Sequence, residues 1–157
     1  MTPFPDQAPT AAYLHIPFCR QKCTYCDFIS FAARGRDCQQ AYVAALLREI
    51  EIVASNRLYL PGRKPVPLQT VFVGGGTPTV LPAGDLVRLL GQLRACFGME
   101  PDCECTVEAN PGTVSQEALE TLYAAGFNRI SFGLQAVQPR LLYLLGRIHE
   151  AGDLATG

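Results

Sequence analysis

No apolar run in the 157-residue sequence approaches the roughly 20 residues that a membrane-spanning helix needs. An excess of charge is also missing, because 13 Lys and Arg residues balance 14 Asp and Glu residues, giving a formal net charge of −1. A nucleic acid or an anionic membrane would favour a basic surface, so neither is expected as a partner. Residues 1–11 contain neither a basic nor an apolar segment, so no signal peptide is predicted and we expect the chain in the cytoplasm.

Disulfides cannot account for all of the cysteines. There are seven, an odd number, and without an export signal the expected compartment is reducing. Three of them, Cys19, Cys23 and Cys26, lie within eight residues, and clustered thiols in such a compartment more often bind a metal or carry out redox chemistry. The dispersed ones are interpreted as structural: Cys38, Cys96, Cys103 and Cys105.

Hydrophobic periodicity predicts a regular alternation of strands and helices after a mobile leader at residues 1–10. Such alternation is typical of a parallel sheet with helices packed outside it. The composition, 48% apolar and 17% charged, suits one globular domain. The predicted fold class is therefore α/β, with about four βα units. Strands are expected at 11–16, 69–73, 103–109 and 128–133, and helices at 38–54, 82–97, 115–125 and from 139 onward.

Polar and glycine-rich segments follow each expected strand. They are the cysteine loop at 17–36, residues 74–77, residues 108–111 and Gln135. In parallel α/β folds, ligands bind beyond the carboxyl ends of the strands, which meet at one rim. Segments that are distant in sequence are therefore expected to form a single site.

The cysteine loop has the spacing C-x3-C-x2-C from Cys19 to Cys26. Thiolates are the usual protein ligands of iron–sulfur clusters. Three thiolates on a [4Fe-4S] cubane leave one iron without a protein ligand, and that iron can take the amine and carboxylate of S-adenosylmethionine. Arg20 and Lys22 add positive charge, which favours thiolates over thiols.

A structural zinc site is a second interpretation of the same cysteines. Zinc needs a fourth ligand, which His15 or Cys38 could supply. Zinc sites more often use C-x2-C pairs, so the spacing favours the iron–sulfur cluster. A zinc module would carry no redox chemistry.

Five motifs resemble, in order, those of one known family. Together they are similar to the oxygen-independent coproporphyrinogen III oxidase family of the radical SAM superfamily, over residues 12–150. The resemblance implies that residues 11–157 are the N-terminal part of a radical SAM core domain, a truncated, partial (β/α) barrel whose C-terminal remainder is absent. The motifs are the run from Tyr13 through the cysteines to Phe28, Gly74-Gly-Gly-Thr-Pro78, Thr106-Val-Glu-Ala-Asn-Pro-Gly112, Asn128-Arg-Ile-Ser-Phe-Gly-Leu-Gln135 and Leu145-Gly-Arg-Ile-His149.

Phe28 distinguishes two branches of this family. The oxidases carry an additional cysteine at this position, two residues after Cys26, whereas the relatives that act as heme chaperones have phenylalanine there. The resemblance therefore implies a protein that binds heme as cargo and delivers it to heme-acceptor proteins, with an electron donor for its cluster. The alternative is an oxidase that decarboxylates coproporphyrinogen III in heme biosynthesis, so whether the chain is an enzyme stays open.

The resemblance also implies which residues bind S-adenosylmethionine. Glu108 matches a residue with a polar contact to the cofactor, and its alternative role is an ion pair with Arg129. Glycines let backbone carbonyls approach an ammonium group closely, although a tight turn would use them equally well. The segment that matches the site of the methionyl amine is Gly74, Gly75, Gly76 and Thr77.

Four further residues complete the expected cofactor pocket. Arg147 matches the arginine that holds the methionyl carboxylate, a task that suits a guanidinium fork. Gln135 matches a position that touches the cofactor, and Tyr13 and Tyr25 match residues that line the pocket of cluster and cofactor. From the residues alone, the arginine could instead be solvated, the glutamine could bond loop backbone, and the tyrosines could serve ordinary packing.

Overall fold

The computed structural model of the chain describes residues 9–32, 34–56 and 66–147. Most of the expected leader, and Ile148 and His149 of the last motif, therefore lie outside the described residues. The strands are β1 (Ala11–Ile16), β2 (Phe18–Cys19), β3 (Phe31–Ala32), β4 (Leu68–Gly75), β5 (Met99–Ala109) and β6 (Arg129–Phe132). The helices are α1 (Arg36–Asn56), a 3-10 turn (Pro78–Val80), α2 (Ala83–Phe97), α3 (Gln116–Ala125) and α4 (Pro139–Leu144).

The main sheet has four parallel strands in the order β1, β4, β5 and β6, which confirms the predicted α/β class. β1 has the predicted bounds, whereas β5 begins at Met99 instead of residue 103. The residues missed at the start of β5 include Glu100, Pro101 and Asp102. Acidic residues are rare in strands, and a proline has no N–H for the ladder, so this segment does not suggest a strand. Strands that follow one another in sequence are thus neighbours in space, as in a partial (β/α) barrel.

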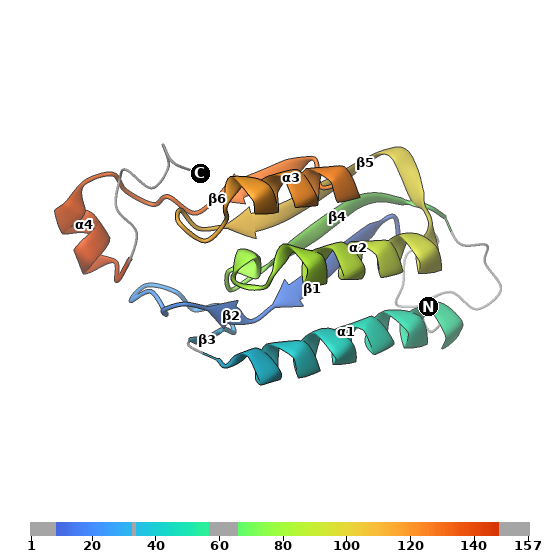
Figure 1. Cartoon of the computed structure of the whole chain (residues 1–157), viewed down its shortest axis with the longest axis horizontal. Helices are drawn as coiled ribbons and strands as arrows, with labels where there is room; N and C mark the ends of the chain where they lie inside the picture. Colours follow the sequence, from blue (N-terminus) through green and yellow to red (C-terminus); the bar gives the residue numbers. More distant parts are fainter. Residues whose placement is uncertain (1–8, 33, 57–65, 148–157) are drawn as a thin grey trace, which may run out of the picture.

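Helices α1, α2 and α3 lie side by side along one face of the sheet (Figure 1). Apolar residues three and four apart place one stripe of α2 in the core, because they share a helix face. The cap predicted for α3 is confirmed, since Ser115 Oγ accepts a hydrogen bond from the Ala118 N–H and Gly126 ends the helix with a left-handed φ of 109°. The buried stripe of α2 consists of Leu86, Leu89, Leu90 and Leu93.

Strand β5 alternates between the helix side and the open face of the sheet, as predicted. Cys103 and Cys105 belong to the core beneath the helices, and their Sγ atoms are 3.9 Å apart. Burial, and then the neighbouring thiol, raises the pKa of Cys105 to about 12. Glu104 and Thr106 lie on the other face, where Thr106 is fully buried.

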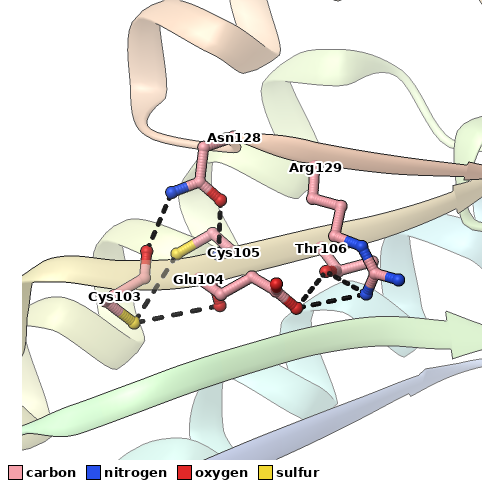
Figure 2. Close-up of polar contacts among 6 residues, drawn as sticks. All are labelled: Cys103, Glu104, Cys105, Thr106, Asn128 and Arg129. Atoms are coloured by element: carbon pink, nitrogen blue, oxygen red, sulfur yellow. Dashed lines mark hydrogen bonds and ion pairs between the residues drawn. The ribbon is translucent and has the colours of Figure 1, made fainter.

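Figure 2 shows how β6 is fixed against β5. The Asn128 side chain donates to the Cys103 carbonyl (2.9 Å) and accepts from the Cys105 N–H (2.8 Å). One side-chain amide thus bonds the β5 backbone on both sides of Glu104. Arg129 Nη1 lies 3.1 Å from Glu104 Oε1. The alternative pairing of Arg129 with Glu108 is therefore wrong, because Arg129 is in register with Thr106 while Glu108 is in register with Ser131.

The raised pKa of Cys105 predicts a thiol that stays protonated and inert. At about pH 8, iodoacetamide should alkylate exposed Cys38 of α1 much faster than Cys105, because the thiolate is the nucleophile. Mass spectrometry of peptides from the native chain measures both rates. Alkylation of Cys105 as fast as Cys38 before unfolding would contradict the buried placement.

Candidate functional site

The cysteine loop is closed at its base by a short ladder that the sequence did not suggest. β2 and β3 pair in parallel, with Cys19 opposite Ala32, and the Phe31 N–H donates to the Pro17 carbonyl at 2.7 Å. Inside the loop, the Cys26 N–H donates to the Cys23 carbonyl at 3.3 Å. The loop therefore leaves and rejoins the fold at adjacent points, which brings its three cysteines to one end of the sheet.

The same loop is attached to the chain beyond α4. The Thr24 N–H donates to the Leu145 carbonyl (3.2 Å), and the Thr24 hydroxyl donates to the Leu144 carbonyl (3.0 Å). Gln21 Nε2 donates to the Gly146 carbonyl (3.2 Å). Residues more than 100 positions apart thus meet beyond the carboxyl ends of the strands, at the left of Figure 1.

A cavity of about 280 Å³ lies between the cysteine loop and the strand ends. The segments expected to converge there do so: the loop, the segment after β4, the end of β5, and the segments after β6 and α4. Of the predicted site residues, those that line this cavity are Cys19, Cys23, Cys26, Tyr25, Gly75, Gly76, Thr77, Glu108, Gln135 and Arg147.

The three glycines at the end of β4, Gly74 to Gly76, are required by close contacts. A Cβ on Gly76 would lie 2.6 Å from the Phe18 carbonyl oxygen and 2.9 Å from Cys19 Sγ. A Cβ on Gly75 would lie 2.7 Å from the His15 ring, and the Gly75 φ of 117° disfavours any side chain. The glycines therefore let this backbone lie directly against the cysteine loop, which a simple turn into a helix would not need.

Glu108 lies over the same glycines. Its Oε2 accepts a hydrogen bond from the Gly75 N–H at 3.0 Å and would lie 2.7 Å from a Cβ on Gly74. A carboxylate thus faces the cavity beside exposed backbone. Glu108 also raises the pKa of the Tyr13 hydroxyl, after the larger effect of burial.

Arg147 connects the segments around the cavity. Its Nη1 donates to Cys23 Sγ at 3.4 Å, and its Nη2 donates to Asn110 Oδ1 at 2.6 Å and to the Gly133 carbonyl. Its Nε is buried without a hydrogen-bond partner among the described residues. A solvated arginine would show neither feature, so the guanidinium is packed into the wall of the cavity.

Gln135 and the two tyrosines differ in their placement. Gln135 lines the cavity and has a φ of 65°, which costs a residue with a side chain of order 1 kcal/mol. Tyr25 lines the cavity, and its hydroxyl has a raised pKa, first from burial and then from Cys23. Tyr13 does not line it, because its hydroxyl is 3.1 Å from His15 Nδ1 and its ring stacks on Phe72.

The geometry disfavours the zinc interpretation. His15 uses its Nδ1 with Tyr13 and its Nε2 with the Ile29 carbonyl (2.8 Å), and Cys38 is exposed on α1. Within the described ranges, no three His, Cys, Asp or Glu side chains lie close enough together to hold a single metal ion. Three thiols around one cavity instead fit a larger multi-iron group, since each thiol can ligate a different iron.

Asn110 is a site residue that the sequence did not single out. It lines the cavity and contacts both Thr77 and Arg147. A turn follows β5 at this point, with the Thr113 N–H donating to the Asn110 carbonyl at 3.0 Å. Only the position at a strand end could have indicated that its side chain faces the site.

A family model for the radical SAM superfamily matches residues 13–154. The chain belongs to the radical SAM superfamily. Relatives named "Heme chaperone HemW" include one from Escherichia coli, 41% identical over 155 residues, and one from a Synechocystis species, 44% identical over 151 residues. They cover 95% and 93% of this chain, respectively.

This chain matches only a part of each of these longer relatives. The chain spans 39% of the Escherichia coli protein and 35% of the Synechocystis protein. A solved Escherichia coli structure, titled as coproporphyrinogen III oxidase (HemN) and as a radical SAM enzyme, matches 93% of the chain with a TM-score of 0.82 and 32% identity. The chain covers 32% of that structure, so its fold corresponds to part of a larger radical SAM protein.

The glycine contacts give a direct test of the site geometry. Gly76→Ala should destabilise the chain by about 1–3 kcal/mol, because the new methyl group overlaps the Phe18 carbonyl and Cys19 Sγ. Gly91→Ala in α2 is the matched control, because nothing lies within 4 Å of its Cβ position. It should raise the thermal midpoint, since alanine favours a helix. Calorimetry compares the two, and equal midpoints would contradict the close packing.

Proposed function

We propose that Cys19, Cys23 and Cys26 hold a [4Fe-4S] cluster whose fourth iron binds S-adenosylmethionine, and that this unit belongs to a heme chaperone. The observation that carries the proposal is the shared cavity, where three thiols meet a carboxylate, an arginine and glycine backbone. Membership of the radical SAM superfamily supports it, because that chemistry uses these two cofactors. When bound, the cluster and S-adenosylmethionine supply one-electron chemistry.

The residues around the cavity suit the two ends of a methionyl group. The Gly75 and Gly76 backbone and the Glu108 carboxylate offer acceptors to its ammonium, whereas Gly74, the other glycine expected there, does not line the cavity. The Arg147 guanidinium, with its unpartnered Nε, offers a donor to its carboxylate. Gln135 and Tyr25 form other parts of the wall, whereas Tyr13 acts at most through its neighbours. These side chains bind and orient the cofactor and exclude water.

Phe28 supports the chaperone over the oxidase. Its ring lines the cavity mouth and is 66% exposed, and a phenyl group cannot replace the additional cysteine of the oxidases. The relatives named as heme chaperones are 38–44% identical to this chain, while the solved coproporphyrinogen III oxidase is 32% identical. Heme is then the cargo, and the chain's role is to hold heme for transfer and not to decarboxylate a porphyrinogen.

Partners and location form part of the same proposal. A heme chaperone requires heme-acceptor proteins, and a redox cluster requires an electron donor. No helix in the described part of the chain is long and apolar enough to cross a bilayer. A cytoplasmic location accords with the reduced thiols that a cluster needs.

Anaerobic reconstitution with iron and sulfide tests the cluster. The chain should turn brown and hold about four iron and four sulfide ions, because three thiolates suffice for a cubane. Serine at Cys19, Cys23 or Cys26 should abolish most of this loading. Cys38→Ser is the control and should load fully, since Cys38 is exposed on α1. A colourless chain that retains zinc would overturn the proposal.

Incubation with heme and with coproporphyrinogen III separates the two family functions. The cluster-loaded chain should form a heme complex that survives gel filtration and should leave coproporphyrinogen III unchanged in the presence of S-adenosylmethionine and a reductant. Absorption spectra follow the heme, and mass spectrometry follows loss of carbon dioxide from the porphyrinogen. A decarboxylated product without a heme complex would favour the oxidase instead.

A further inference from the structure

A continuous network of hydrogen-bonded side chains joins two of the three cysteines of the loop, Cys19 and Cys23. Asn110 is at its centre, with Nδ2 donating to Thr77 Oγ1 (2.8 Å) and Oδ1 accepting from Arg147 Nη2 (2.6 Å). At the outer ends, the Thr77 hydroxyl donates to Cys19 Sγ (3.8 Å) and Arg147 Nη1 donates to Cys23 Sγ (3.4 Å). Three segments that follow β4, β5 and α4 thereby reach the cysteine loop.

The chemistry of arginine fixes the direction of every donor in this chain. A guanidinium has only donors, so the Asn110 oxygen must face Arg147 and its NH2 group must face Thr77. The Thr77 oxygen then accepts, which leaves its own proton free to point at Cys19 Sγ. Both ends of the chain therefore direct a donor toward sulfur.

Asn110 is held rigidly by its own turn. The Thr113 hydroxyl accepts from the Asn110 N–H (3.1 Å) and donates to the Asn110 carbonyl (2.6 Å). The Thr79 hydroxyl lies 2.6 Å from the same Thr113 oxygen and can fill its second acceptor site. A Cβ on Gly133 would lie 2.7 Å from Asn110 Oδ1, so the amide can occupy this position only because the facing residue is a glycine.

The network also forms a wall between two cavities. Cys23, Thr77, Asn110 and Arg147 line both the 280 Å³ cavity and a second one of about 290 Å³. The second lies on the side of Arg20, whose Nη1 donates to the Gly112 carbonyl at 3.0 Å.

We propose that Asn110 is a positioning residue that orients the Thr77 and Arg147 donors onto the Cys19 and Cys23 thiolates and so raises the reduction potential of the cluster. Hydrogen bonds to cluster sulfur stabilise the reduced, more negative state, which is the physical basis of the effect. The inference rests on the proposed function, since it needs a cluster on these cysteines.

Asn110→Asp keeps the shape of the side chain and reverses the direction of its hydrogen bond with Thr77. The new carboxylate still accepts from Arg147 but cannot donate to Thr77, so the Thr77 hydroxyl turns toward it and away from Cys19. Asn110→Leu removes both arms. Both variants should shift the cluster potential to more negative values, as measured by redox titration followed by electron paramagnetic resonance.

Asn128→Asp is the matched control. Asn128 also makes two hydrogen bonds, but they go to the β5 backbone at Cys103 and Cys105 and not to the cysteine loop (Figure 2). This variant should lower the thermal midpoint and leave the cluster potential unchanged. If Asn110 had only a structural role, Asn110→Asp would behave like Asn128→Asp, with a lower thermal midpoint and an unchanged cluster potential.

The outcomes separate the inference from the proposed function. If the unaltered chain takes up no cluster, the proposed function fails and the inference fails with it. If the unaltered chain loads and titrates but both Asn110 variants titrate at its potential, the inference alone is overturned. If Asn110→Leu does not fold, Asn110→Ala decides, because it removes both arms without adding a charge, whereas the aspartate charge would lower the potential by itself.

Discussion

The close approach of the glycine segment to the cysteine loop is the constraint on which the site depends. Gly76 lies where any side chain would collide with the Phe18 carbonyl and with Cys19 Sγ. Its N–H donates to the Ile16 carbonyl (2.8 Å), and the Thr77 N–H donates to the Phe18 carbonyl (2.7 Å), so backbone hydrogen bonds hold the two segments together. This contact fixes one thiol relative to the parallel sheet, and the remaining segments of the rim are arranged around it.

The parallel sheet explains why such a contact can exist. Four parallel strands joined by helical crossovers bring four carboxyl ends to one end of the sheet, while α1, α2 and α3 cover one of its faces. The core side of β5 is apolar and belongs to the same hydrophobic cluster as Leu89 and Leu93 of α2, which leaves the cavity side free for polar groups. Stability and ligand binding thus use different faces of the same strands.

The sequence predicted what repeats along the chain and missed what depends on contacts between distant segments. The alternating apolar pattern located every strand of the main sheet, and the capping residues Ser115 and Gly126 located α3. The β2–β3 ladder has two residues in each strand, too few to show a period. The partner of Arg129 depends on inter-strand register, which no single strand encodes. Asn110 was missed because an asparagine before proline predicts a turn, and its amide contacts arise only when α4 returns to the rim.

The proposed site requires that three thiolates bind a cubane and leave one iron for S-adenosylmethionine. Mössbauer spectroscopy of the chain reconstituted with isotopically enriched iron tests it most directly. The account predicts that adding S-adenosylmethionine changes the signal of one iron site and leaves the other sites as they were, because only one lacks a thiolate. A spectrum that does not respond to S-adenosylmethionine, or in which all iron sites change together, would contradict the account.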